Sequence, residues 1–114
     1  MHELSIAQSI IKIVESSLPN KNENKVNSVH LLIGKLSGIE IDALQFAYSV
    51  LKNNSFLYSS VLKIDETNGQ AKCLTCNITF EMNRYGTPCP ECGGYAFEIL
   101  QGKEMKVLKI NIDD

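Results

Sequence analysis

Cys73-Leu74-Thr75-Cys76 and Cys89-Pro90-Glu91-Cys92 are two cysteine pairs of the same C-x-x-C form, with residues 77–88 between them. Two such pairs on a short hairpin can bring four thiolates to the corners of a tetrahedron. Four soft ligands in that geometry select zinc. The pattern therefore predicts a zinc site with four ligands: Cys73, Cys76, Cys89 and Cys92. A closed four-thiolate site leaves no open position for a substrate, which favours a structural role over catalysis.

The composition of the cysteine segment, from about Gly69 to Glu98, supports the same interpretation. The stretch between the pairs offers Ile78, Phe80 and Tyr85 as apolar side chains. These are too few for a core, so a segment of about 30 residues would need a metal to fold. The glycines that follow Cys92 allow a tight turn, which lets amide N–H groups point at the sulfur atoms.

Two other interpretations of the cysteines stay open at this point. The pairs could form disulfides, or one pair could be a thioredoxin-like redox motif, which usually lies at the start of a helix beside a βαβ pattern. Neither pair opens a helical pattern, and duplication at short spacing is what a zinc site needs. Zinc is the favoured interpretation for these reasons.

Residues before the cysteine segment show the patterns of a small α/β domain. Apolar residues three and four apart predict an amphipathic helix from Leu4 to Leu18, which Pro19 ends. The polar run from Asn20 to Ser28 predicts a loop. The next run, from Val29 to Leu36, predicts a buried strand.

Three further elements follow along the chain. Ser37-Gly38-Ile39-Glu40 has the spacing of a capping box and predicts the start of a helix that continues through Leu51. Strands are predicted from Val61 to Glu66 and from about Lys103 to Ile112. In the last strand the apolar residues alternate with polar ones, the pattern of a half-buried strand. These apolar residues are Leu108, Ile110 and Ile112.

The order of these elements predicts an α+β fold. The strand–helix–strand unit from Val29 to Glu66 should form a right-handed crossover, which makes its two strands parallel. We therefore expect a small α/β domain, with a three-stranded mixed sheet and two helices, and an inserted zinc-ribbon-like domain. The expected boundaries are residues 1–69 and 99–114 for the α/β domain and 70–98 for the zinc-binding domain.

Charge and composition exclude several classes of function. Eleven basic and thirteen acidic residues give a formal net charge of −2. Four thiolates and one Zn²⁺ would bring the loaded chain to about −4, which argues against nucleic-acid binding. We expect a cytoplasmic protein, because no apolar run is long enough for a transmembrane helix and the first residues lack a basic signal region. No catalytic constellation stands out, so we expect no enzymatic activity.

Met1-His2-Glu3 contains a second set of potential metal ligands. A free α-amine, the backbone nitrogen of His2 and an imidazole nitrogen of His2 can close two fused chelate rings, and planar nitrogen ligands suit Ni(II) or Cu(II). Glu3 could add its backbone nitrogen or its carboxylate. For the tripeptide alone, a frayed helix start is the simpler interpretation. His30, the other histidine, is more typical of a packed or hydrogen-bonded residue than of a ligand.

Taken together, the Met1-His2-Glu3 start and the cysteine segment resemble the HypA/HybF family of hydrogenase/urease nickel-incorporation proteins. Three further segments match the family, so that the resemblance covers essentially the whole chain: Ile33-Gly34-Lys35-Leu36-Ser37-Gly38, Leu44-Gln45-Phe46-Ala47-Tyr48 and Gly102-Lys103-Glu104-Met105. The start and the cysteine pairs are specific in combination, whereas neither is specific alone.

The resemblance implies a nickel metallochaperone. Family members bind Ni(II) through the N-terminal amine of Met1, through His2 and through the neighbouring backbone, with Glu3 beside them, and they hold a structural zinc on the four cysteines. They work with a partner GTPase, HypB, to deliver nickel to the large subunit of NiFe-hydrogenase, and some members also serve urease maturation with urease accessory proteins. The working form, monomer or homodimer, stays open. The alternative is a zinc-ribbon module that binds protein or nucleic acid and has no nickel function.

Overall fold

The computed structural model describes residues 3–18 and 25–113. The chain divides into two compact units. The first comprises residues within 1–31, 39–64 and 107–114, and the second comprises residues 32–38 and 65–106. The second unit contains the whole of the expected insert, residues 70–98, together with chain on both sides of it.

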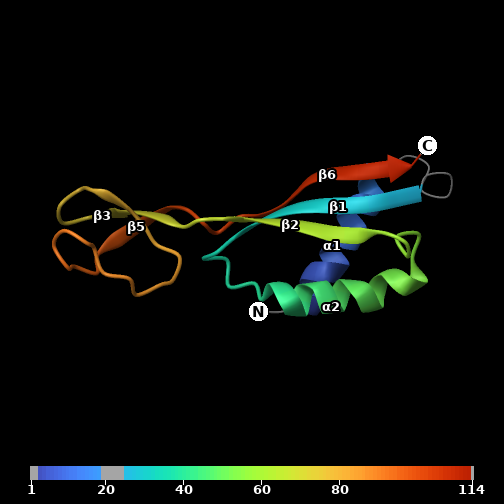
Figure 1. Ribbon diagram of the computed structural model, residues 1–114, viewed down its shortest axis with the longest axis horizontal. Coiled ribbons are helices and arrows are strands. Elements are labelled where there is room, and N and C mark those ends of the chain that lie inside the picture. The colour runs from blue at the N-terminus through green and yellow to red at the C-terminus, as the bar shows by residue number, and fades with distance from the viewer. Residues whose placement is uncertain (1–2, 19–24, 114) are drawn as a thin grey trace. The chain divides into compact units, whose positions relative to one another are not determined.

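The first unit contains two helices that pack against each other, α1 (Glu3–Ser17) and α2 (Ile41–Leu51) (Figure 1). A short 3-10 helix, η1 (Lys52–Asn54), continues from the end of α2. Apolar side chains at helical spacing point into the core from both helices. The buried ones are Ala7, Ile10 and Val14 on α1 and Leu44, Ala47 and Tyr48 on α2. The predicted helix from Leu4 to Leu18 is confirmed to within one residue at each end.

The start of α2 differs from the prediction. Gly38 has a φ of 79°, a left-handed conformation that keeps residues 37–40 out of the helix. Glu40 is the N-cap and no side chain caps the helix, so the predicted capping box is wrong. The backbone N–H of Glu40 donates instead to the Glu3 carboxylate at 3.2 Å. The carboxylate of Glu3, at the start of α1, thus accepts a hydrogen bond from a backbone N–H group at the start of α2.

A three-stranded sheet accompanies the helices, formed by β1 (Lys25–Gly34), β2 (Val61–Thr67) and β6 (Met105–Asp113). The strand order is β2-β1-β6. β1 and β2 run in the same direction and β6 runs opposite to them (Figure 1). The mixed sheet and its strand–helix–strand crossover are therefore confirmed.

β1 begins earlier than the sequence pattern predicts. The run from Asn20 to Ser28 is predicted as a loop, but residues 25–28 belong to the strand, and residues 19–24 lie outside the described residues. Val26 and Ser28 are both buried, and the Ser28 hydroxyl accepts a hydrogen bond from Asn111 at 2.8 Å. The polar composition of residues 25–28 led to the prediction of a loop. The buried Ser28 is tolerated in the strand because its hydroxyl is hydrogen-bonded to the side chain of Asn111 on β6.

The second unit is built on an antiparallel sheet of β3 (Gln70–Cys73), β4 (Thr79–Glu81) and β5 (Phe97–Gln101) in the order β4-β3-β5. Ala71 pairs with Phe80 on one side and with Ile99 on the other, and a β-bulge separates Gln70 from Ala71. The small core of this unit is made of Leu36, Ala71, Cys73, Phe80, Met82 and Cys89. Two of these are predicted zinc ligands, so the metal site and the core coincide.

Three glycines allow the backbones within the second unit to approach closely. A Cβ on Gly34 would lie 1.9 Å from the carbonyl oxygen of Gly102, and one on Gly69 would lie 1.7 Å from that of Met82. The N–H of Leu36 donates to the Gly102 carbonyl at 2.8 Å. Side chains at these positions would separate the strands that lead to the cysteines.

Candidate metal centre

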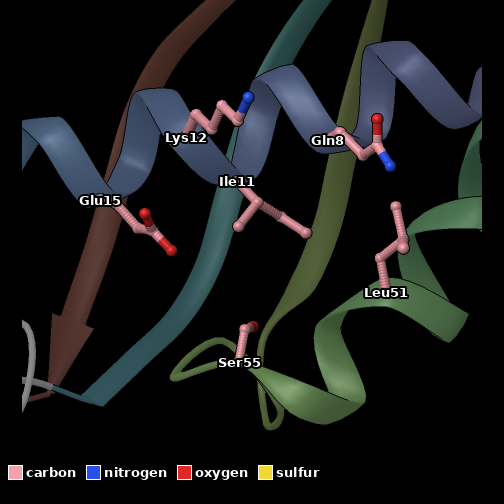
Figure 2. Close-up of a pocket in the computed structure, with 6 residues that line it drawn as sticks. All are labelled: Gln8, Ile11, Lys12, Glu15, Leu51 and Ser55. Atoms are coloured by element: carbon pink, nitrogen blue, oxygen red, sulfur yellow. The ribbon is translucent and has the colours of Figure 1, made fainter.

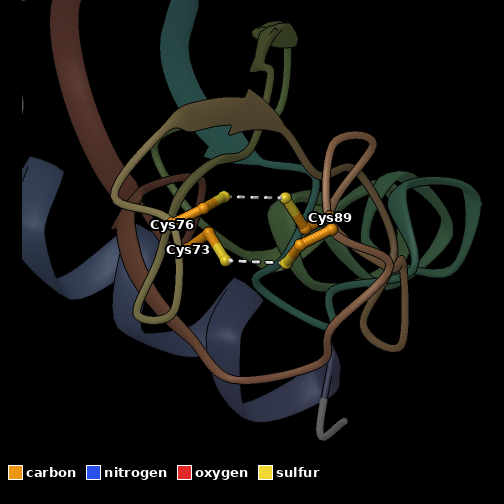
Figure 3. A group of neighbouring side chains, drawn as sticks. Cys73, Cys76 and Cys89 are labelled. Carbon is orange, nitrogen blue, oxygen red and sulfur yellow. Dashed lines mark hydrogen bonds between the residues drawn. The ribbon is translucent and has the colours of Figure 1, made fainter.

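The four cysteine sulfur atoms meet in one cluster (Figure 3). Cys73 ends β3 and Cys76 follows in the next turn, while Cys89 and Cys92 come from the loop between β4 and β5. Each Sγ lies within 4.8 Å of the other three. The shortest separations are 3.6 Å between Cys73 and Cys92 and 3.5 Å between Cys76 and Cys89. The structure thus brings together all four predicted zinc ligands.

The two cysteine pairs adopt the same turn. The N–H of Asn77 donates to the Cys73 carbonyl, and the N–H of Gly93 donates to the Cys89 carbonyl, at 2.9 and 2.8 Å. Asn77 and Gly93 both have positive φ angles, 65° and 71°. Glycine and asparagine are the residues that take this conformation most readily. The backbone geometry of the turn therefore favours glycine or asparagine at the position after each C-x-x-C pair.

The sulfur geometry fits zinc. A tetrahedral site with Zn–S bonds of about 2.3 Å places its sulfur atoms about 3.8 Å apart. The observed separations of 3.5 and 3.6 Å lie close to this value. They are far longer than the roughly 2.05 Å of a disulfide bond, and all four cysteines are free thiols. The disulfide interpretation therefore fails for this structure.

The thiols of the cluster differ in acidity. Backbone N–H groups of Cys76 and Thr75 donate to the Cys73 sulfur and lower the pKa of Cys73 to about 6. The N–H of Ile78 favours the Cys76 thiolate, but burial and the neighbouring sulfur atoms outweigh it and raise the pKa of Cys76 to about 12. Four thiolates so close together repel one another, so the fully ionised set requires a cation at its centre.

At the other metal site, Met1 and His2 lie outside the described residues, and Glu3 is the first residue of α1. The Glu3 carboxylate accepts the N–H of Glu40, as described above. Sequence reasoning named Glu40 in a capping box but did not single it out as a residue of the metal site. The sequence placed Glu40 at the predicted start of α2. It did not show that the start of α2 lies beside the start of α1.

Comparison with known proteins identifies the family. The family model for hydrogenase/urease nickel incorporation, metallochaperone HypA, matches residues 1–112. The chain belongs to the HypA family. Hydrogenase maturation factor HypA from Parabacteroides distasonis is 41% identical over 98% of this chain and 97% of its own. That from Cupriavidus necator is 35% identical over 100% of this chain and 96% of its own.

A solved structure in the HypA family shares the fold. The solution structure of the Ni metallochaperone HypA from Helicobacter pylori superimposes with a TM-score of 0.66 at 26% identity, over 98% of this chain and 97% of the other. The function of the family is nickel delivery for hydrogenase and urease maturation, and the four-cysteine cluster of this member fits a structural zinc site. Within residues 3–18 and 25–113, no helix is long and apolar enough to span a membrane.

Two other features of this HypA-family chain could be taken for sites. His30 is half-buried, and its Nε2 lies 3.1 Å from the Asn111 amide nitrogen, the hydrogen-bonded role favoured for it from sequence. An open hollow of about 350 Å³ lies beside α1, near the end of α2 (Figure 2). Its lining residues are Gln8, Ile11, Lys12, Glu15, Leu51 and Ser55. One carboxylate beside a lysine makes a poor metal site.

Proposed function

We propose that this chain binds Ni(II) at its N-terminus and delivers it to a nickel enzyme during maturation. The proposed ligands are the α-amine of Met1, the backbone and imidazole nitrogens of His2, and Glu3. The observation that carries the assignment is the hydrogen bond from Glu40 to the Glu3 carboxylate. It holds Glu3, the third residue of the proposed ligand set, at the start of α2.

The backbone at the start of α1 suits such a site. The first N–H groups of a helix have no partner within the helix, so a metal can replace the amide protons there without breaking a helical hydrogen bond. The positive end of the helix dipole opposes a cation. Glu3 and Glu40 place two carboxylates at the starts of the two helices, and these offset that opposition.

The contact with Glu40 also divides the roles of Glu3. Its carboxylate already accepts a hydrogen bond, so we assign the backbone nitrogen of Glu3 as its metal-binding atom. The carboxylate then acts as a positioning group, because it holds the end of the chain beside α2. This assignment chooses between the two ligand atoms that the sequence left open.

We further propose that Cys73, Cys76, Cys89 and Cys92 hold one structural zinc, and that the expected insert at residues 70–98 is its domain. The protein has no catalytic activity of its own in this proposal. It works in the cytoplasm with a HypB-type GTPase and passes nickel to the large subunit of NiFe-hydrogenase, or to urease accessory proteins. Membership of the HypA family of maturation factors supports these partners.

The decisive experiment is a calorimetric titration of the protein, with an untagged N-terminus, with nickel. His2→Ala should lower the nickel affinity by at least about 100-fold, because it removes the imidazole from the chelate. One residue added before Met1 should weaken binding similarly, since it displaces the amine while keeping His2. The matched control is His30→Ala, which removes the other histidine. Equal nickel affinity in His2→Ala and the parent protein would overturn the N-terminal site.

A further inference from the structure

The four cysteines of the cluster differ in how open they are to solvent. Cys73 and Cys89 are buried and Cys76 is half-buried, whereas Cys92 is exposed. Gly94 adds no cover, although a Cβ at its position would lie 3.3 Å from the Cys92 sulfur. The cysteines that oxidise most readily are exposed thiolates, and a cysteine that binds a metal is a thiolate. A small polar oxidant therefore meets the cluster first at Cys92.

Both of the shortest sulfur separations join the first C-x-x-C turn to the second (Figure 3). The Cys73 sulfur lies 3.6 Å from that of Cys92, and the Cys76 sulfur lies 3.5 Å from that of Cys89. A disulfide bond needs about 2.05 Å, so the sulfur atoms of each pair must approach by about 1.5 Å. Small rotations of the two side chains can supply this movement.

The backbone holds the two turns together for such a reaction. The N–H of Leu74, inside the first turn, donates to the carbonyl of Ala96, four residues after Cys92, at 2.9 Å. The N–H of Cys73 donates to the Ile78 carbonyl at 2.8 Å, which fixes the first turn on its other side. The folded unit thus presents the first pair of cysteines to the second.

We propose that Cys92 is an oxidation site, and that hydrogen peroxide converts the zinc-loaded cluster into two disulfides, Cys73–Cys92 and Cys76–Cys89. In the first step the Cys92 Sγ attacks one oxygen of peroxide, so that an S–O bond forms, the O–O bond breaks and hydroxide leaves. The Cys73 Sγ then attacks the Cys92 Sγ, the disulfide forms and the S–O bond breaks with loss of a second hydroxide. With two protons from solvent the hydroxides become water, and the two sulfur atoms have given two electrons to one peroxide.

The first disulfide removes two of the four zinc ligands, so the remaining two thiolates lose the metal. A second peroxide then joins Cys76 to Cys89 by the same steps. Each disulfide links the turn after β3 to the loop between β4 and β5, the same two segments that a zinc ion would link. The oxidised second unit therefore stays cross-linked without zinc, and a thiol reductant with added zinc restores the loaded form.

An unfolded chain would choose the opposite pairing. The entropic cost of closing a loop grows with the logarithm of its length. Cys73 and Cys92 are 19 positions apart, whereas the cysteines of one C-x-x-C pair have two residues between them. This difference favours disulfides within each pair by at least about tenfold in an unfolded chain. The pairing of the disulfides thus reports whether the cluster was folded when it was oxidised.

The test oxidises the zinc-loaded full chain with hydrogen peroxide, blocks the remaining thiols and digests the protein with trypsin. Cleavage after Arg84 separates the two cysteine pairs into peptides 73–84 and 85–103. Disulfides between the turns join these peptides, whereas disulfides within a turn leave them separate, so mass spectrometry distinguishes the two. Joined peptides should exceed separate ones by at least about tenfold, the reverse of the ratio in an unfolded chain. Further cleavage after Glu91 should leave the Cys92 fragment attached through Cys73.

The matched control is the same chain, oxidised after zinc has been removed in denaturant, where separate peptides should dominate. A sulfenic-acid trap added with peroxide should label Cys92 in the zinc-loaded protein, and each chain should release one zinc ion. This inference rests on the proposed zinc site, and zinc content measured before oxidation tests that site by itself. Zinc-loaded protein that yields separate peptides, equal amounts of joined peptide in both samples, or a trap that labels another cysteine would each overturn the proposal.

Discussion

At the scale of single residues, the two cysteine turns differ in the residue that takes the left-handed conformation. Gly93 has no Cβ and adopts φ 71° without strain, whereas Asn77 adopts φ 65° at a modest cost. Gly93→Ala should therefore destabilise the zinc-loaded second unit by about 1 kcal/mol, although nothing lies within 4 Å of the added methyl group. Asn77→Gly is the matched change and should be neutral or stabilising. Thermal unfolding of the zinc-loaded protein measures both, and destabilisation by Asn77→Gly would contradict the argument.

The acidity of single thiols predicts how zinc affinity depends on pH. Zinc binds thiolates, so each thiol that is protonated at the working pH must release a proton on binding. The pKa of Cys73 is about 6, lowered by backbone N–H groups, and the pKa of Cys76 is about 12. These values belong to the folded cluster; in the metal-free protein, whose second unit we expect to be unfolded, the thiols return to the ordinary cysteine pKa of about 8.5, so most of them are protonated at about pH 7.5.

The affinity should therefore fall as the pH falls below the ordinary cysteine pKa of about 8.5, because zinc must then displace a proton from every thiol. Calorimetric titration with zinc in buffers of different ionisation enthalpy counts the released protons at each pH. The count should rise toward four as the pH falls from about 8.5 to about 6.5. A count that stays near three at about pH 6.5 would show that Cys73 keeps its low pKa without zinc, and hence that the cluster is folded without the metal.

At the scale of the elements, α2 begins without a side-chain cap. Glu40 is extended at the N-cap, with φ −83° and ψ 110°, but its side chain makes no capping hydrogen bond. Aspartate is among the best N-cap residues and keeps the negative charge. Glu40→Asp should therefore stabilise the first unit by about 0.5–1 kcal/mol in chemical denaturation. Glu40→Ala provides the control without a cap, and an equal gain there would argue against capping as the cause.

Element positions were largely predictable from the sequence, whereas the contacts between elements were not. Apolar spacing located α1 and α2 because both bury a single face, at Ile10 and Leu44 for example. It missed residues 25–28 of β1, where polar Ser28 is buried through its bond to Asn111 of β6. That bond joins residues 83 positions apart along the chain. Local patterns carry no information about such a pair.

In the candidate metal sites, too, local features were predictable from the sequence and contacts between elements were not. Spacing alone predicted that the four cysteines meet in one cluster, because each C-x-x-C turn is local and its duplication is visible in the sequence. Glu40 was missed because it meets Glu3 only after the two helices pack. The exposure of Leu108 was also unpredictable, since alternation predicts which face a residue occupies but cannot tell whether that face is covered.

At the scale of the whole molecule, zinc should separate the stabilities of the two units. The core of the second unit has six buried residues, and two of them, Cys73 and Cys89, are proposed zinc ligands. Burial of the remaining four side chains offsets only a small part of the conformational entropy of ordering residues 65–106. The first unit has its own core between the helices and the sheet, with no cysteine in it.

Removing zinc with a strong chelator should therefore unfold the second unit while α1 and α2 remain helical. Amide exchange followed by mass spectrometry would show rapid exchange in β3 and β5 and continued protection in α1. Cys73→Ala should reproduce this pattern without a chelator, because three thiolates bind zinc far more weakly than four. Protein isolated without chelators should contain about one zinc per chain. Protection of β3 that survives complete zinc removal would mean that Leu36, Phe80 and Met82 hold the unit together without the metal.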